Sequence, residues 1–343
     1  MSRLGVLLVN LGSPDSPSVT DVRRYLREFL SDPRVIDTPW LLRMFVLHAF
    51  ILPRRPAESA HAYAKIWTKE GLPLVVTSRK VEARLREMLP MPVELGMRYG
   101  NPSIPSAVAK LRAAGVNTAL LMPMFPHYAM SSYETAVERA REAAREEGGG
   151  MRLRVLPPFF AEPGYLSALA ASLRPHLAKP YDHVLFSFHG VPERHMRKSD
   201  PSGRHCLASP DCCEQPHLAH ATCYRAQACR TAREVAAAVG LPEGKWSISW
   251  QSRLGRDPWL KPYTDEVLHE LPARGVKRIV VLSPTFVADC LETIEELGMR
   301  GAESFRESGG EEFTLVPCLN DAPDWVATIA SWARRMAAET DPN

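Results

Sequence analysis

The chain carries no glycine-rich phosphate loop of the GxGxxG or GxxxxGK(S/T) type behind any of its apolar runs. Such loops bind the phosphates of dinucleotides and nucleoside triphosphates, so their absence argues against dehydrogenase and kinase functions. The 343 residues also have a net charge of only +3, which is too small a basic excess to indicate nucleic acid as a partner. We therefore expect a small or neutral ligand and no nucleic acid.

No apolar run reaches the length of a membrane-spanning helix. The most apolar stretch, residues 40–52 (WLLRMFVLHAFIL), is about half as long as a bilayer-spanning helix requires. The first residues, MSRLGVLLVNLGSPDS, contain no signal-peptide cleavage pattern and indicate a β-strand that ends at Gly-Ser-Pro. The sequence predicts a cytoplasmic protein, long enough for about two domains.

Four apolar runs end in loops rich in Gly, Pro, His and Ser: GVLLVNLGSP, TALLMPMFPHY, HVLFSFHG and IVVLSPTF. Helical patterns such as VTDVRRYLREFL and TAVERAREAAREE alternate with them, which predicts an α/β fold with mainly parallel, doubly wound sheets. A break around residues 157–182 divides the chain into two Rossmann-type domains, 1–165 and 166–343. The last helix is a candidate for packing back on the first domain.

Three acidic residues, Asp289, Glu292 and Glu296, are spaced at i, i+3 and i+7 in FVADCLETIEEL. A single helix with this spacing would carry all three along one face. The predicted strand KRIVVLSP precedes it, which places the acids at the carboxyl end of a sheet, where open α/β folds keep their active sites. Two interpretations stay open: a path for protons or metal ions, and a solvated acidic face near a helix N-terminus.

His189 ends the predicted strand HVLFSFH, and Gly190 lets the backbone turn directly after it. An imidazole at a strand end can accept a proton or carry a metal ion near neutral pH. A lone histidine is more often structural, but a second strand end delivers the three acids toward the same edge, which favours a functional site.

The apolar stretch 40–52 has three interpretations. It is a buried core helix, an apolar lip over a hydrophobic ligand, or a segment in a membrane interface with Arg43, Arg54 and Arg55 at the headgroups. Its exposure would distinguish them.

Five of the seven cysteines are crowded into one segment with the pattern C-x5-C-C-x9-C-x5-C, from Cys206 to Cys229. Thiolates in a reducing compartment suit zinc or an iron–sulfur cluster, although no C-x2-C pair of the zinc-knuckle type is present. Free thiols, and a zinc site completed by His205, His217 or His220, are the alternatives.

Several motifs together resemble those of the ferrochelatases. FSFHGVPERH, WQSRLGRDPWLKPYTDE and FVADCLETIEELG occur in the order and spacing of that family, and LLVNLGSPDS, KIWTKEGLPL, MRYGNPS and MPMFPHYAMSS match its first half. The resemblance covers about residues 4 to 330. It implies two Rossmann-like chelatase domains with a cleft between them, and an enzyme that inserts Fe²⁺ into protoporphyrin IX to form protohaem, the last step of haem biosynthesis, with release of two protons.

The resemblance also implies roles for the predicted site residues. His189 and Glu292 match the catalytic pair that takes pyrrole protons or presents the substrate iron, and Asp289 and Glu296 match a path for iron or protons. Cys290 stands where some relatives have histidine, so a second imidazole is not carried over.

Further residues match the family's contacts with the macrocycle. Leu11, Tyr128 and Trp259 correspond to apolar walls, and Arg55 and Arg98 to contacts with the propionates. Taken alone, the apolar residues suit a core and the arginines suit a solvated surface.

The cysteine segment resembles the insert in which some bacterial ferrochelatases hold a [2Fe–2S] cluster. Of the five thiols we expect Cys206, Cys212, Cys213 and Cys223 as ligands, because Cys229 falls within the helical pattern CRTAREVAAAVG. A cobalt or nickel chelatase for an earlier tetrapyrrole and a haem or metal carrier are the rival functions. Residues 40–52 suggest peripheral contact with the inner membrane, and the sequence leaves the oligomeric state open.

Overall fold

The computed structural model describes residues 3–148, 150–255 and 257–340. These residues form two compact units, each built around one four-stranded sheet. Unit 1 comprises Met1–Met124, Met130–Pro157 and Asp321–Asn343, and unit 2 comprises Phe125–Ala129 and Pro158–Asn320. Both units are therefore assembled from segments that are not continuous in the sequence.

The sheet of unit 1 has the strand order β2-β1-β3-β4, and all its neighbouring strands are parallel. The central strand β1 is buried on both faces at Val6, Leu7, Leu8 and Val9, as parallel sheets covered by helices require. The strands are β1 (Leu4–Ser13), β2 (Val93–Gly100), β3 (Thr118–Pro123) and β4 (Arg152–Val155).

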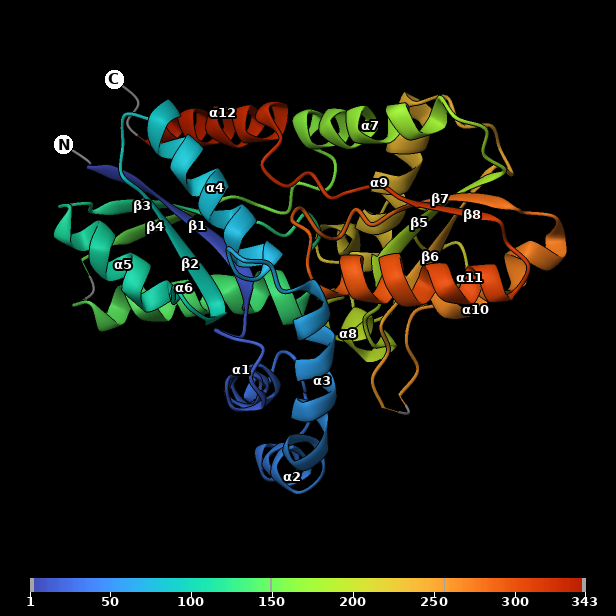
Figure 1. Cartoon of the computed structure of the whole chain (residues 1–343). Coiled ribbons are helices and arrows are strands. Elements are labelled where there is room, and N and C mark those ends of the chain that lie inside the picture. Colours follow the sequence, from blue (N-terminus) through green and yellow to red (C-terminus); the bar gives the residue numbers. More distant parts are fainter. Residues whose placement is uncertain (1–2, 149, 256, 341–343) are drawn as a thin grey trace. The chain divides into compact units, whose positions relative to one another are not determined.

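Helices cover both faces of this sheet: α4 and α12 lie on one face and α5 and α6 on the other (Figure 1). Separately, α1 packs against α3. The helices of unit 1 are α1 (Val19–Ser31), α2 (Trp40–Val46), η1 (Leu47–Ile51), α3 (Leu52–Ile66), α4 (Pro73–Met88), α5 (Ile104–Ala113), η2 (Met130–Glu134), α6 (Thr135–Glu146) and α12 (Pro323–Thr340).

Unit 2 repeats the same strand order, β6-β5-β7-β8, again with parallel neighbours. Its strands are β5 (His183–His189), β6 (Trp246–Gln251), β7 (Arg278–Leu282) and β8 (Glu312–Leu315). Its helices are α7 (Pro163–Leu177), α8 (Glu193–Lys198), η3 (Leu218–Ala221), α9 (Tyr224–Ala238), α10 (Thr264–Glu270), η4 (Leu271–Arg274), η5 (Glu292–Gly301) and α11 (Ala302–Glu307). The helices α7 and α9 cover one face and α10 and α11 the other (Figure 1).

The prediction of an α/β fold with two parallel, helix-flanked sheets is confirmed. The four apolar runs correspond to β1, β3, β5 and β7, and the helical patterns correspond to α1, α6 and α9. The carboxyl ends of β5, β6 and β7 meet at one edge of the second sheet, and His189 and Gln251 stand there as paired residues. The predicted site residues of unit 2 gather around this edge.

The stretch 40–52 forms the short helix α2 followed by the π-helical turn η1. Trp40 is 64% exposed and Leu41 74%, so the interpretation as a buried core helix is wrong. No helix among the described residues is both long enough and apolar enough to cross a bilayer.

Candidate active site

His189 is the last residue of β5, a strand that is buried at every position before it. Its backbone N–H donates to Thr285 Oγ1 at 3.1 Å, and its carbonyl accepts a hydrogen bond from Tyr224 Oη at 2.8 Å. Its ring Nδ1 lies 2.6 Å from Gly190 O. A carbonyl can only accept, so Nδ1 carries a proton, and whenever the ring is neutral the lone pair of Nε2 is available for a proton or a metal ion.

Gly190 is required by the close approach of the turn to β6. Its N–H donates to Gln251 O at 2.6 Å, and a Cβ at this position would lie 2.8 Å from the same oxygen. The same Cβ would be 3.3 Å from a ring carbon of Trp259, so the indole packs directly on the turn that carries His189. Trp259 is fixed there by a hydrogen bond from its indole N–H to Leu254 O at 3.0 Å.

The acidic residues do not share one helix, which corrects the prediction from their spacing. Asp289 precedes the helix, and Glu292 and Glu296 lie in η5, a π-helix over Glu292–Gly301. The i→i+5 hydrogen bonding of a π-helix changes which residues share a face, so a spacing argument that assumes 3.6 residues per turn fails here. Such π-helical segments often occur at functional sites.

Glu296 and Glu292 are held by residues at the end of β6. Ser252 Oγ donates to Glu296 Oε2 at 2.5 Å, and Gln251 Nε2 donates to the backbone oxygen of Glu292 at 3.1 Å. Burial raises the pKa of Glu296, and the negative charge of Glu292 adds to this, while the Ser252 hydrogen bond and the charge of His189 oppose it. Glu292 and His189 therefore both act electrostatically on Glu296.

Asp289 is occupied by hydrogen bonds within unit 2. Its carboxylate accepts from Asn320 Nδ2 at 2.6 Å, from Thr293 Oγ1 at 3.1 Å and from the Cys318 N–H at 3.3 Å. These donors anchor the loop before η5 to the loop after β8. A structural role accounts for the geometry of Asp289, whereas a role in iron passage is a prediction that these contacts do not require.

The cysteine insert follows α8 and ends at α9. Cys206, Cys212 and Cys223 are buried and Cys213 is half-buried, and all seven cysteines of the chain are free thiols. Cys212 Sγ lies 3.9 Å from Cys213 Sγ. Hydrogen bonding with the Cys213 thiol, then the Ala226 N–H and Cys206, lowers the pKa of Cys223 to about 6, although burial opposes this.

The insert is anchored at its base by Asp200. Its carboxylate accepts hydrogen bonds from the backbone N–H groups of Ser202, His205 and Cys206 at 2.7 to 2.9 Å. These hydrogen bonds depress the pKa of Asp200 far below its ordinary value, against the effect of burial. Among the described residues, no group of three or more His, Cys, Asp and Glu side chains is arranged to hold a metal ion.

The remaining predicted contacts are distributed over both units. In unit 1, Leu11 is half-buried at the end of β1 and Arg55 is exposed on α3. Arg98, in β2, forms an ion pair with the buried Asp32 and donates to Thr135 Oγ1 at 2.7 Å. In unit 2, Tyr128 is half-buried, and its backbone N–H donates to Gln227 Oε1 at 2.7 Å. The guanidinium of Arg98 is thus already engaged inside unit 1.

Sequence reasoning missed the residues that position the predicted site. Thr285, Tyr224 and Ser252 hold His189 and Glu296, yet a hydroxyl in a loop gives no pattern of its own. Thr285 could nevertheless have been singled out, because it is a polar residue that directly follows a predicted strand in the sequence. Ser252 lies in the motif WQSRLG. Tyr224 had no such signal, because only the folded chain brings α9 next to the end of β5.

The fold is that of chelatases. The structure aligns with SirB from Bacillus subtilis with Fe³⁺ at a TM-score of 0.57 and 11% sequence identity, over 98% of this chain and 97% of that one. It also aligns with the sirohydrochlorin chelatase SirB from Bacillus subtilis subspecies spizizenii in complex with cobalt, at a TM-score of 0.55 and 10% identity, over 98% and 96% of the two chains. These identities are too low to show more than a common fold.

The sequence identifies the family within that fold class. The ferrochelatase family model matches residues 3–337. The chain is 55% identical over 336 residues to the ferrochelatase of Azotobacter vinelandii, covering 97% of this chain and 99% of that protein. It is 54% identical over 337 residues to the ferrochelatase of Pseudomonas fluorescens, covering 98% of both. The chain belongs to the ferrochelatase family.

Proposed function

We propose that His189 and Glu292 carry out the reaction of this family, the insertion of Fe²⁺ into protoporphyrin IX to form protohaem. The reaction exchanges two pyrrole N–H protons for one ferrous ion, so it needs a group that accepts protons and a route for them to leave. His189 accepts a pyrrole proton at Nε2, and Glu292 is the acidic partner of the pair. Glu296, with its raised pKa, is suited to pass the proton on.

The observation that carries this proposal is the state of the His189 ring. Its Nδ1 is bound to Gly190 O and its backbone is bound to Thr285 and Tyr224, so the ring is oriented and only Nε2 is left to react. Preorganised groups of this kind need no rearrangement when the substrate arrives, which is how positioning accelerates a reaction.

The substrate is tested by comparing rates of metal insertion into protoporphyrin, coproporphyrin and sirohydrochlorin. The proposal predicts that Fe²⁺ enters protoporphyrin fastest. Preferential insertion of cobalt or nickel into sirohydrochlorin would instead support a chelatase of an earlier tetrapyrrole. Tight binding of the product without turnover would indicate a haem carrier.

We further propose that the insert holds a [2Fe–2S] cluster on Cys206, Cys212, Cys213 and Cys223. The donor set supports this: three of these thiols are buried, Cys212 Sγ lies 3.9 Å from Cys213 Sγ, and the thiols of Cys213 and Cys206 both act on the pKa of Cys223. Hydrogen bonding with Cys213 and Cys206 lowers the pKa of Cys223 and so favours its thiolate, the form that binds metal, whereas burial and the neighbouring thiol of Cys223 raise the pKa of Cys206 and Cys213. Cys229 lies inside α9, beyond the N-cap position of Cys223. A bound cluster would supply one-electron redox chemistry and crosslink the insert.

The cluster is tested by the absorption spectrum of the purified protein, with analysis for iron and acid-labile sulfide. Visible charge-transfer bands and equal amounts of iron and sulfide are expected, and Cys223→Ser should abolish both. A colourless protein that contains zinc would refute the cluster and favour the zinc alternative.

Leu11, Arg55, Arg98, Tyr128 and Trp259 are the proposed contacts of the macrocycle. The position of Trp259 against the His189 turn supports its role best, and the ion pair of Arg98 with Asp32 supports its role least. We also propose a cytoplasmic location with peripheral contact at the inner membrane through residues 40–52, supported by the exposed apolar side chains of α2 and η1.

A further inference from the structure

The helix α2 and the turn η1 turn an apolar face outward. Six large apolar side chains on them are more than a third exposed: Trp40, Leu41, Leu42, Phe45, Val46 and Phe50. Phe45 and Phe50 pack edge to face with ring centroids 5.8 Å apart, so the exposed side chains form a patch rather than isolated residues. Proteins rarely expose such a patch unless it meets a partner or a membrane.

Of the three arginines that the sequence places at lipid headgroups beside this patch, one is buried. Arg43 is buried and donates to the backbone oxygens of Ile36 and Thr38, at 3.2 and 2.8 Å. Its predicted place at lipid headgroups is therefore wrong, because it holds α2 against the preceding loop. Arg54 and Arg55 are exposed on α3, as a place at the headgroups would require.

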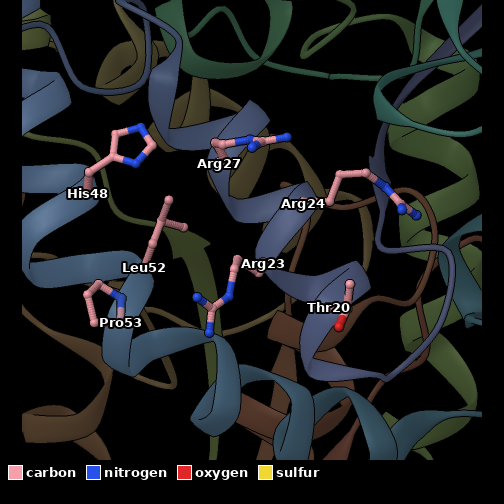
Figure 2. Close-up of a pocket in the computed structure, with 7 residues that line it drawn as sticks. All are labelled: Thr20, Arg23, Arg24, Arg27, His48, Leu52 and Pro53. Carbon is pink, nitrogen blue, oxygen red and sulfur yellow. The ribbon is translucent and has the colours of Figure 1, made fainter.

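A cationic groove lies where α1 meets η1 and α3. It has a volume of about 400 Å³, within the range of roughly 300–1,000 Å³ that small-ligand sites occupy. Figure 2 shows Arg23, Arg24 and Arg27 of α1 around it, with His48 and Leu52 on the neighbouring helical segment. Thr20 and Pro53 complete the lining.

The charge of this groove is positive and largely uncompensated. Arg24 pairs with Asp15 at 2.7 Å and with Asp21 at 2.8 Å. Arg23 and Arg27 form no ion pair within the part of the chain that the structure describes. The segment 38–57, which supplies the apolar patch and one wall of the groove, contains no Asp or Glu. The segment that carries the apolar patch therefore contributes His48 and no acid to a groove that Arg23 and Arg27 also line.

We propose that this groove binds the phosphate of an anionic phospholipid headgroup while the patch on α2 and η1 lies in the bilayer interface. Arginine guanidinium groups are suited to a phosphodiester, because they donate paired hydrogen bonds to its oxygens. Apolar residues inserted at the acyl boundary with arginines at headgroup level are the pattern of interfacial helices. A second copy of the chain is a poorer occupant, because a symmetric contact would set the two cationic grooves against each other.

This inference rests on the peripheral membrane contact proposed above and adds a headgroup site and a lipid class. It also assigns Arg23, Arg27 and His48, which lie outside the catalytic residues, a role in recognition. The two arginines are one helical turn apart on α1, so they face the same side of the helix.

The test is sedimentation of the whole protein with vesicles of phosphatidylcholine, with and without about one third phosphatidylglycerol. We expect binding only to the anionic vesicles. Arg23→Gln combined with Arg27→Gln should weaken it about 30-fold, because each arginine near an anionic surface contributes about fivefold. Trp40→Ser combined with Phe45→Ser should weaken binding as well. Arg79→Gln combined with Arg112→Gln is the matched control: it removes the same charge from α4 and α5, away from the groove, and should leave binding almost unchanged.

Three outcomes would overturn the proposal in different ways. If the arginine pair binds vesicles like its control while the apolar pair does not, the membrane contact stands and the headgroup site is refuted. If neither the wild type nor any variant binds the vesicles, the peripheral membrane contact itself is refuted. If calorimetry detects inorganic phosphate on Arg23 and Arg27 but vesicles do not bind, the groove is a site for free phosphate. Metal insertion measured in detergent separates all three from a failure of the catalytic proposal.

Discussion

At the residue scale, the predicted site depends on side chains that orient His189 rather than on His189 alone. Tyr224 Oη lies 2.8 Å from the His189 carbonyl and 3.0 Å from Thr285 Oγ1, which in turn accepts from the His189 N–H. The hydroxyls of Tyr224 and Thr285 and the backbone of His189 therefore form one hydrogen-bonded group at the end of β5. Tyr224 directly follows Cys223, so the cysteine insert ends beside this group.

Tyr224→Phe tests this arrangement, because it removes one hydroxyl and leaves the ring in place. A lost hydrogen bond of this kind is worth about 1 kcal/mol, so we expect kcat to fall about fivefold with little change in KM. The measurement is steady-state iron insertion, with thermal unfolding as the control for the fold. A rise in KM without a change in kcat would contradict a positioning role.

The positions of the two proposed catalytic residues were predictable from sequence relative to the strands. His189 ends the apolar strand β5, Glu292 follows the apolar strand β7 after a loop, and both belong to recognisable motifs. Arg43 was not predictable, because an arginine in an apolar run can either face solvent or, as here, bind backbone oxygens inside the protein. Local sequence does not decide between these, since the choice depends on the path of the preceding loop.

At the element scale, Gly12 fixes the approach of β1 to β2. Its φ is +100°, and a Cβ there would lie only 1.8 Å from Tyr99 O. Gly12→Ala should therefore lower the free energy of unfolding by about 2 to 3 kcal/mol through strain and overpacking. Gly71→Ala is the control, because its φ of +121° is also positive but its nearest neighbour is Val76 at 3.6 Å. Urea unfolding should show a clearly smaller loss there, and equal losses would contradict the clash.

Asp182 joins the start of β5 to β7 and makes this part of unit 2 sensitive to acid. The Arg278 side chain, followed by the N–H groups of Arg278 and Lys277, lowers the pKa of Asp182 to about 2. A carboxyl with a depressed pKa stabilises the folded state above its ordinary value of 3.8, and this contribution is lost as the pH falls toward about 2.

Asp182→Asn should accordingly lower the free energy of unfolding by about 1 to 2 kcal/mol at pH 7, after allowance for solvent screening. The difference from wild type should shrink as the pH falls from 4 toward 2. Urea midpoints measured over this range check the prediction. A difference that stays constant with pH would mean that the charge of Asp182 contributes nothing.

The elements themselves divide into those that sequence predicts and those that it does not. Buried strands such as β1 and β5 are recognisable in the sequence as long apolar runs. The edge strands β4 and β8 are four residues each and have no buried position, because β4 alternates exposed with half-buried residues and β8 has one exposed and three half-buried residues, so their signal is weak. The π-helix η5 was expected as an α-helix, because the two have the same apolar composition and differ only in hydrogen-bond spacing.

At the scale of the whole molecule, unit 1 is closed by the last helix of the chain. In α12, Trp325, Ile329 and Trp332 are buried, and the helix packs against α4 and β3. Arg334 also donates to Met88 O at the end of α4, at 2.8 Å. The first and last segments of the chain therefore share one hydrophobic core, although the residues of unit 2 lie between them in the sequence.

Trp332→Ala should destabilise unit 1 by about 3 to 5 kcal/mol, because it leaves a large cavity in that core. Ser331→Ala changes the neighbouring residue, which is exposed on the same helix, and should have almost no effect. Limited proteolysis and urea unfolding would show whether the loss begins in the segments of unit 1. Equal behaviour of the two variants would contradict the contribution of α12 to the unit.

The central claim is that His189 and Glu292 together exchange pyrrole protons for iron, and the most direct test is steady-state insertion of Fe²⁺ into protoporphyrin IX by His189→Asn, Glu292→Gln and wild type. We predict that kcat falls by at least about 1,000-fold in each variant, within the range of general acid–base contributions, while both proteins unfold at the temperature of the wild type. Insertion by His189→Asn at the wild-type rate would contradict the account.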